Sequence, residues 1–415
     1  MCLKRAKSAP LEITLYSSST LTLSPTRGGH WLAGVLTPYL QNINTLRVSC
    51  VPAIEFKTIL PNFPRSTPNL QSLTFTGWGN MWWAYAGPSK ANDLFDSLPH
   101  TLKHLSLFKL PLHPSLLKLR TLTELDLHDF HCELHLDTLL EFLEENCSLA
   151  SATLEIRFIK PSLHISRRQN PIKNRLRYLQ IVCSDTAEGQ ALISGIALPK
   201  GATLEVYGRP ANGSGVGVND ILSGISTTHL SNLPSPTSME YHTYTRDIRL
   251  VGPNGSAKFC TRSCSEIPFI EFPLLPLANI RWLHLDTRSW YSIQPPPGPA
   301  VFTNLSFFPA LETLTIAHNT GLSHLLSPLF SSPASSPSLE GLVFLGCSVT
   351  KKFMEELTQF ASDRRDTTST WLRRIVIYDL EGGFPSASVR RLEKHVPAVN
   401  VEIVKEIQTP PWREE

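Results

Sequence analysis

The chain has 415 residues, and its 41% hydrophobic content is enough to bury a core and to exclude global disorder. Charge is nearly balanced, with 38 lysines and arginines against 35 aspartates and glutamates, and this scattered excess argues against nucleic acid as a partner. The sequence has neither a run of about 18 apolar residues nor an apolar leader region, which argues against a membrane span and a secretory signal.

The first predicted elements are an alternating strand and a short amphipathic segment. Leu11–Leu15 alternates apolar and polar residues, as a half-buried strand does. An amphipathic segment covers residues 31–40, and a second strand is predicted over Ile43–Val48. These elements begin a strand-and-return pattern that continues down the chain.

A six-residue pattern, L-x-x-L-x-L, then recurs along most of the sequence. Its copies begin at Leu70, Leu102, Leu122, Leu176, Ile280, Leu311, Leu339 and Leu372. Each copy predicts a short strand whose apolar residues point into a shared core. The sequence therefore predicts an α/β leucine-rich-repeat solenoid over residues 1–415, curved, with a parallel sheet on the concave face and irregular helices and loops on the convex side.

The segments that return from one strand to the next are of two kinds. Apolar residues at helical intervals predict helices over Leu136–Glu145, Thr350–Ala361 and Ser386–His395. Gln294–Pro299 and Ser331–Pro337 are too rich in proline for a long helix and are predicted to be exposed loops. The 33 prolines thus lie mainly in connections.

The repeat fades in the middle of the chain, and residues 210–275 are predicted to form an irregular insertion. Within it, the alternating runs Asp247–Val251 and Ser256–Phe259 flank Gly252-Pro253-Asn254-Gly255, which predicts a hairpin. The repeat ends with a strand over Val399–Ile403, and the polar tail 409–415 is expected to fray.

The residues between the leucines of each copy are predicted to project from the concave face, where a protein partner would bind. One strip comprises Thr74, Ser106, Asp126, Glu155, Gln180, Glu205, His284 and Thr315. Beside it runs a second strip of Thr76, Phe108, His128, Arg157, Tyr207 and Asp286. A solvated sheet face without a partner is the alternative, and the loops and the convex side compete as binding surfaces.

Three tryptophans, Trp78, Trp82 and Trp83, follow one repeat strand closely. Exposed aromatic side chains are favoured anchors of protein interfaces, so these residues are candidate partner contacts. Packing against neighbouring loops is the other interpretation.

The sequence predicts neither a metal site nor catalysis. His128, His131, Cys132 and His135 crowd together, but zinc sites usually need two separated ligand pairs, and Cys260 and Cys264 likewise lack a second pair. Because catalytic and nucleotide-binding motifs are absent, we expect a protein that is not an enzyme and takes no cofactor. The eight dispersed cysteines favour reduced thiols and a cytoplasmic or nuclear location.

Two segments resemble the leucine-rich-repeat F-box-type proteins of mushroom-forming fungi. Arg5–Ile13 looks like the S-x-A-P-L-x-I start of their repeat region, and Asp247–Ser256 is similar to their hairpin. The resemblance covers most of the chain, because the irregular repeats match in style.

This resemblance implies substrate recognition in a cullin-RING ubiquitin ligase. In that family an N-terminal F-box docks onto a Skp-type adaptor while the repeats hold the target. Residues 1–20 contain nothing like the F-box motif, so an adaptor is an expected partner only if an F-box lies upstream. A ligand-sensing or scaffold protein without ligase coupling is the alternative.

Overall fold

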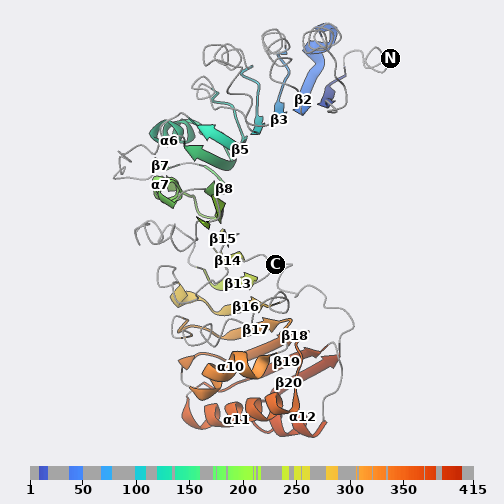
Figure 1. The fold of residues 1–415 in the computed structure, drawn as a ribbon, viewed down its shortest axis with the longest axis vertical. Helices are drawn as coiled ribbons and strands as arrows, with labels where there is room; N and C mark the ends of the chain where they lie inside the picture. Colours follow the sequence, from blue (N-terminus) through green and yellow to red (C-terminus); the bar gives the residue numbers. More distant parts are fainter. Residues whose placement is uncertain are drawn as a thin grey trace. The chain divides into compact units, whose positions relative to one another are not determined.

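The computed structural model comprises two compact units, Met1–Ala211 and Asn212–Glu415, which we call unit 1 and unit 2 (Figure 1). The structure describes residues 9–16, 37–49, 67–76, 99–108, 119–132, 136–158, 172–173, 175–183, 186–208, 210–211, 214–215, 236–242, 247–253, 255–261, 277–287, 305, 308–319, 321–332, 335–368, 370–379 and 386–403. Whether the units form the single predicted domain stays a prediction.

Unit 1 is built on a parallel sheet with one strand per repeat. In spatial order its strands are β1 Leu11–Tyr16, β2 Ile43–Ser49, β3 Ser72–Thr76, β4 His104–Phe108, β5 Glu124–Cys132, β6 Ser151–Phe158, β8 Tyr178–Cys183 and β10 Thr203–Gly208. Equivalent leucines lie side by side, for example Leu73, Leu105 and Leu125 on β3, β4 and β5. These leucines are 0–2% exposed, so the repeat pattern forms the core on the inner face of the sheet.

A tight turn precedes several of the repeat strands that the structure describes and leads into the strand from the previous repeat. The Leu102 N–H donates to the Pro99 carbonyl, and Leu70 and Leu149 make the same bond to the residue three positions earlier. Four residues just before the first leucine of a repeat donate a side-chain hydrogen bond to a carbonyl of the preceding repeat: Asn69 to Gln41, Thr101 to Pro68 and Leu70, Thr121 to Leu102, and Ser338 to Pro309. This ladder of side-chain bonds fixes the register between repeats.

In the described part of unit 1, two helices connect one repeat strand to the next. Helix α6, Leu136–Glu145, has the predicted bounds and buries Leu139, Leu140 and Leu143. Helix α7, Thr186–Gly195, was not predicted. A Cβ at Gly195 would lie 2.8 Å from Leu140 Cδ1, so glycine permits the close approach of α7 to α6.

Unit 1 also contains several shorter elements. The 3-10 helix η1 spans Thr37–Asn42 at the end of the predicted amphipathic segment. Strands β7 Ile172–Lys173 and β9 Ile196–Ala197 form a separate parallel pair. A further short strand of unit 1 is β11 Pro210–Ala211, and unit 2 contains the short strand β12 Ser214–Gly215.

The strands of unit 2 continue the repeat pattern but begin with an antiparallel hairpin. In spatial order they are β15 Gly255–Thr261, β14 Asp247–Gly252, β13 Ser238–His242, β16 Trp282–Asp286, β17 Thr313–Ala317, β18 Gly341–Leu345, β19 Arg374–Asp379 and β20 Ala398–Ile403. The predicted hairpin is confirmed, because β14 pairs antiparallel with β15 and Gly252 lies opposite Gly255. Strand β14 also pairs with β13, so the hairpin belongs to the sheet of this unit.

Three helices and a short 3-10 helix, η6 Leu277–Asn279, provide return segments in unit 2. Helices α11 Lys351–Thr367 and α12 Ser386–Leu392 overlap the predicted ones, whereas α10 Leu322–Ser331 was not predicted. Phe353 of α11 contacts Phe344 of β18 and Phe330 of α10, with ring centroids 5.3 and 6.0 Å apart. This aromatic cluster joins the helices to the inner face of the sheet.

The structure confirms the predicted α/β leucine-rich-repeat fold: one short parallel strand recurs per repeat, and the repeated leucines form the core. Among the described segments, no helix is long and apolar enough to cross a membrane.

Candidate functional site

The face of each sheet opposite the buried leucines, here called the outer face, carries polar side chains in rows. In unit 1 the first row is Ser72, His104, Glu124, Ser151, Tyr178 and Thr203. The middle row is Thr74, Ser106, Asp126, Thr153, Gln180 and Glu205, and the third contains Thr76, Phe108, His128, Glu155, Val182 and Tyr207. The rows arise because alternate side chains of a strand point to opposite faces.

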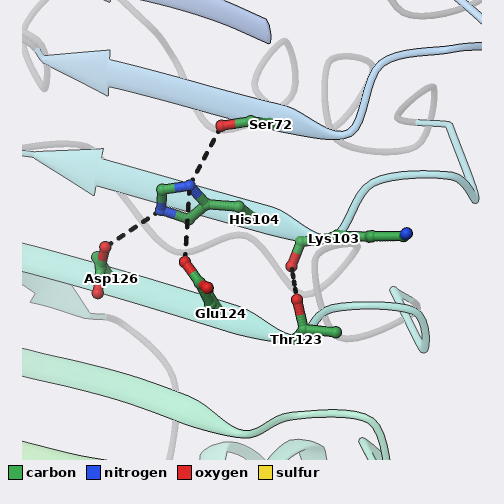
Figure 2. A network of polar contacts seen from close by, with 6 residues as sticks. All are labelled: Ser72, Lys103, His104, Thr123, Glu124 and Asp126. Atoms are coloured by element: carbon green, nitrogen blue, oxygen red, sulfur yellow. Dashed lines mark hydrogen bonds and ion pairs between the residues drawn. The ribbon is translucent and has the colours of Figure 1, made fainter. Parts of the chain in front are cut away.

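His104 joins three neighbouring strands at the centre of a polar network (Figure 2). Its Nε2 lies 3.3 Å from Asp126 Oδ2, and its Nδ1 lies 3.2 Å from Ser72 Oγ and 4.0 Å from Glu124 Oε2. The Asp126 hydrogen bond raises the pKa of His104, against the opposing effects of burial and of Arg47. His104 thus links β3, β4 and β5, and its contact with Asp126 favours the protonated form of its imidazole.

His128 forms the second imidazole–carboxylate pair of this face. Its Nδ1 lies 3.5 Å from Glu155 Oε2, and the hydrogen bond to Glu155 raises the pKa of His128. A β-bulge places His128 and Asp129 of β5 opposite the single residue Glu155 of β6. The bulge gives His128 this partner, in keeping with the frequent use of bulges to re-aim side chains. The ring of Phe108 lies beside His128, with centroids 5.9 Å apart.

A third group is built from two tyrosines around one carboxylate. The Tyr178 and Tyr207 hydroxyls both donate to Glu205 Oε2, at 2.9 and 2.8 Å. Burial and the Glu205 hydrogen bond raise the pKa of Tyr178, so its hydroxyl stays protonated and remains a donor. These mutual bonds hold the outer face of β8 and β10 in one arrangement.

Ser72, His104 and Asp126 share the hydroxyl–imidazole–carboxylate connectivity of serine hydrolases. One observation speaks against that chemistry. Backbone N–H groups around Ser72 serve the parallel ladder of β2 to β4, so they do not project as oxyanion donors.

Unit 2 has a more buried charged group on its own outer face. His242 Nδ1 lies 3.4 Å from Asp286 Oδ2 on the neighbouring strand, and its Nε2 lies 3.6 Å from Glu240 Oε2. Arg249 of β14 approaches Glu240 at 3.7 Å, and the His284 ring centroid lies 6.0 Å from that of His242. Hydrogen bonds that His242 donates to Asp286 and Glu240 raise its pKa to about 9, so it is an imidazolium near neutral pH.

The outer face of unit 2 changes character towards its C-terminal strands. Ala317, Val343, Leu345 and Val376 occupy positions that are polar in unit 1, and they form a buried apolar cluster. Thr315 is in register with Val343 and is only 4% exposed. The accessible polar face is therefore best developed in unit 1.

The structure revises two of the predicted strip positions. Glu155 is in register with Val182 in the third row, and the middle-row position of β6 belongs to Thr153. Ala152 takes the place of the second repeat leucine, in register with Leu125, so the repeat was not recognised there and the prediction counted the outward positions of β6 two residues too late. Arg157 lies opposite His131 and beyond the bulge, so it is not in the row of Phe108 and Tyr207.

The other predicted contacts of unit 1 lie in the rows given above, while His284 and Asp286 lie on the outer face of β16. Their role in binding stays a prediction. Asp286 is only 5% exposed, which makes it a poor partner contact. Trp78, Trp82 and Trp83 lie outside the described residues. The described part of the chain shows no group of three His, Cys, Asp or Glu residues arranged to hold a metal.

Several residues of these clusters were missed, and the sequence contains a signal for some of them. Glu240 and His242 lie on β13, which reads Pro236-x-x-Met239-x-Tyr241 where other repeats have leucines. Met239 and Tyr241 alternate with polar residues as in a strand, but the search for leucines did not reveal this repeat. His104, Glu124 and Tyr178 occupy first-row positions, which the two predicted strips did not include.

Comparison with known proteins gives few relatives. No family model and no curated protein matches the sequence. Among solved structures, the leucine-rich repeat-containing protein LegL7 from Legionella pneumophila is 12% identical, with 97% of this chain and 93% of that chain covered and a TM-score of 0.25. The leucine-rich-repeat protein LIC12759 from Leptospira interrogans is 16% identical over 85% and 82% of the two chains, with a TM-score of 0.25.

Proposed function

We propose that this chain is a non-catalytic protein-recognition module and that its partner binds to the outer face of unit 1. One observation carries the proposal: hydrogen-bonded imidazole, phenol and carboxylate groups cover the outer face of β4 to β10. Groups fixed in this way bind a partner with little loss of side-chain freedom. Tyrosine and phenylalanine among them offer the aromatic contacts that interfaces favour.

The test is a steric block at the centre of the face. Ser106 is part-buried in the middle row between Thr74 and Asp126, so Ser106→Arg would project a long cation from the face while leaving the core intact. Ser148 is exposed in a turn beyond the sheet, and Ser148→Arg is the matched control. We expect cross-linking and co-purification to recover a partner with wild type and S148R, and at least about tenfold less with S106R. Equal recovery with both variants would remove the outer face as the binding surface.

We further propose that the module is a substrate receptor of the F-box type in a cullin-RING ubiquitin ligase. The support is the resemblance of Arg5–Ile13 and Asp247–Ser256 to that family. The alternative is a ligand-sensing or scaffold protein without ligase coupling. We also propose a cytoplasmic or nuclear location, supported by the dispersed cysteines.

Co-purification with and without an added Skp-type adaptor distinguishes the two roles. An F-box coding segment upstream of Met1, together with adaptor binding, is the expected result for the ligase role. A partner that binds while the adaptor does not would favour the scaffold.

A further inference from the structure

Two imidazoles on the outer face of unit 1 are each paired with a carboxylate of the next strand. The groups that face His104 are Ser72 of β3, Arg47 of β2, and Glu124 and Asp126 of β5. Each histidine therefore spans neighbouring strands, so a change in its protonation alters charge pairs between repeats.

His128 has a different set of neighbours. Glu155 of β6 pairs with it, Asp126 acts on it from its own strand, and the ring of Phe108 lies beside it on β4. Only the carboxylates among these groups carry charge, and both favour the imidazolium.

The two pairs share one carboxylate, Asp126. Asp126 bonds to His104 and to Thr153, and the charges of His104 and His128 both lower its pKa. In return, the charge of Asp126 raises the pKa of His128 as well as that of His104. When titratable groups interact through a common group, the observed pKa values belong to the whole set and not to single residues.

We propose that His104, Asp126, His128 and Glu155 form a proton-operated switch that sets the charge which the outer face presents to its partner. This inference rests on the proposed function for its role and on the geometry of the four residues for its mechanism. The described outer-face rows of β4 to β10 contain four carboxylates, Glu124, Asp126, Glu155 and Glu205, and two histidines. With both imidazoles protonated these six groups sum to −2, and with both neutral they sum to −4.

The direction of the switch follows from its contacts. The carboxylates hold the pKa of both imidazoles above the ordinary 6.5, so each loses its proton at a pH above that value. As the pH rises, the imidazoles beside Asp126 and Glu155 lose their positive charge, so the outer face presents more net negative charge to a partner. A partner with a basic contact surface therefore binds more tightly at the higher pH, and one with an acidic surface binds less tightly.

The test needs no partner, so its outcome is independent of the binding experiment above. It follows the imidazole signals of His104 and His128 by NMR from about pH 5 to pH 9, each assigned from a His→Gln variant. Asp126→Asn should lower the pKa of His104 and, to a smaller extent, that of His128, because His104 is hydrogen-bonded to Asp126 whereas His128 feels only its charge. Glu155→Gln should lower the pKa of His128 and leave that of His104 close to wild type.

Glu205→Gln is the matched control, because Glu205 bonds to the two tyrosines. It should move neither histidine appreciably. The proposal is overturned if Asp126→Asn leaves His128 unchanged, since the two pairs would then titrate independently. It is also overturned if E155Q shifts the pKa of His128 no more than E205Q does, a comparison that stands even if D126N fails to fold.

Discussion

Arg364 of α11 is a fully buried cation, and its replacement gives a sharp test of what holds the end of unit 2 together. Its Nη2 donates to the carbonyls of Leu339 and Pro337, at 2.8 and 3.2 Å, and so joins α11 to the turn before β18. Arg364→Met keeps most of the side-chain volume and removes the charge and the donors.

The magnitude follows from two opposing contributions to the free energy of unfolding. Hydrogen bonds from a charged donor to buried carbonyls contribute about 1.5–3 kcal/mol each, and both are lost. Burial lowers the pKa of Arg364 from 12.5 to about 10, which corresponds to a desolvation cost of roughly 3 kcal/mol that the methionine relieves. We therefore expect R364M to destabilise the fold by up to about 3 kcal/mol, and R364A, which also opens a cavity, by roughly 2–5 kcal/mol more.

Urea unfolding followed by circular dichroism measures both variants. Arg365→Met is the control, because Arg365 is exposed and only stacks on Trp371, at 5.7 Å, and bonds the Lys394 carbonyl. It should cost less than about 1 kcal/mol. A stability of R364M clearly above that of wild type would refute the reasoning, since desolvation would then outweigh the two hydrogen bonds.

Three further changes test other parts of the structure. The pKa of His242 is raised to about 9, so its pair with Asp286 contributes stability that is fully present below about pH 6.5 and is lost as the pH rises through 9. The difference in melting temperature between wild type and Asp286→Asn should therefore shrink from pH 7 to pH 10. A constant difference would contradict the assignment. Gly195→Val should lower stability by about 1–3 kcal/mol in urea titrations because its side chain meets Leu140, whereas Gly201→Ala, in open space at φ +86, should cost only about 1 kcal/mol. Thr350→Ala removes the N-cap of α11 and should cost about 1 kcal/mol by the same titration, with Thr350→Ser close to wild type.

The repeat strands could be predicted because the residues that each strand buries are the same leucines that repeat in the sequence. Each copy places two apolar residues on the inner face, so the strands at Leu105 and Leu125 were found from the pattern alone. Helix α6 was found for the same reason, since its apolar residues recur at helical intervals. Helices α7 and α10 were missed because local signals oppose them: α7 contains two glycines, and α10 contains Pro328.

The candidate site was only partly predictable, because it depends on register between strands. Outward positions follow from alternation within one strand, and this placed Asp126, Gln180 and Glu205 correctly in one row. A bulge after Leu127 places two residues of β5 opposite one residue of β6. The bulge does not alter the alternation within either strand, so the contact of His128 with Glu155 could not be derived from either strand by itself. Ala152 stands where other repeats have a leucine, which hid the repeat in β6.

The side-chain bonds to carbonyls of the preceding repeat also bear on how the chain folds. They connect residues only 19 to 33 positions apart in a chain of 415 residues. Contacts of such short range cost little loop-closure entropy, so each completed repeat can template the next without waiting for distant parts of the chain. Assembly should then spread from repeat to neighbouring repeat, and its rate should depend far more on the weakest junction between repeats than on the total length of the protein.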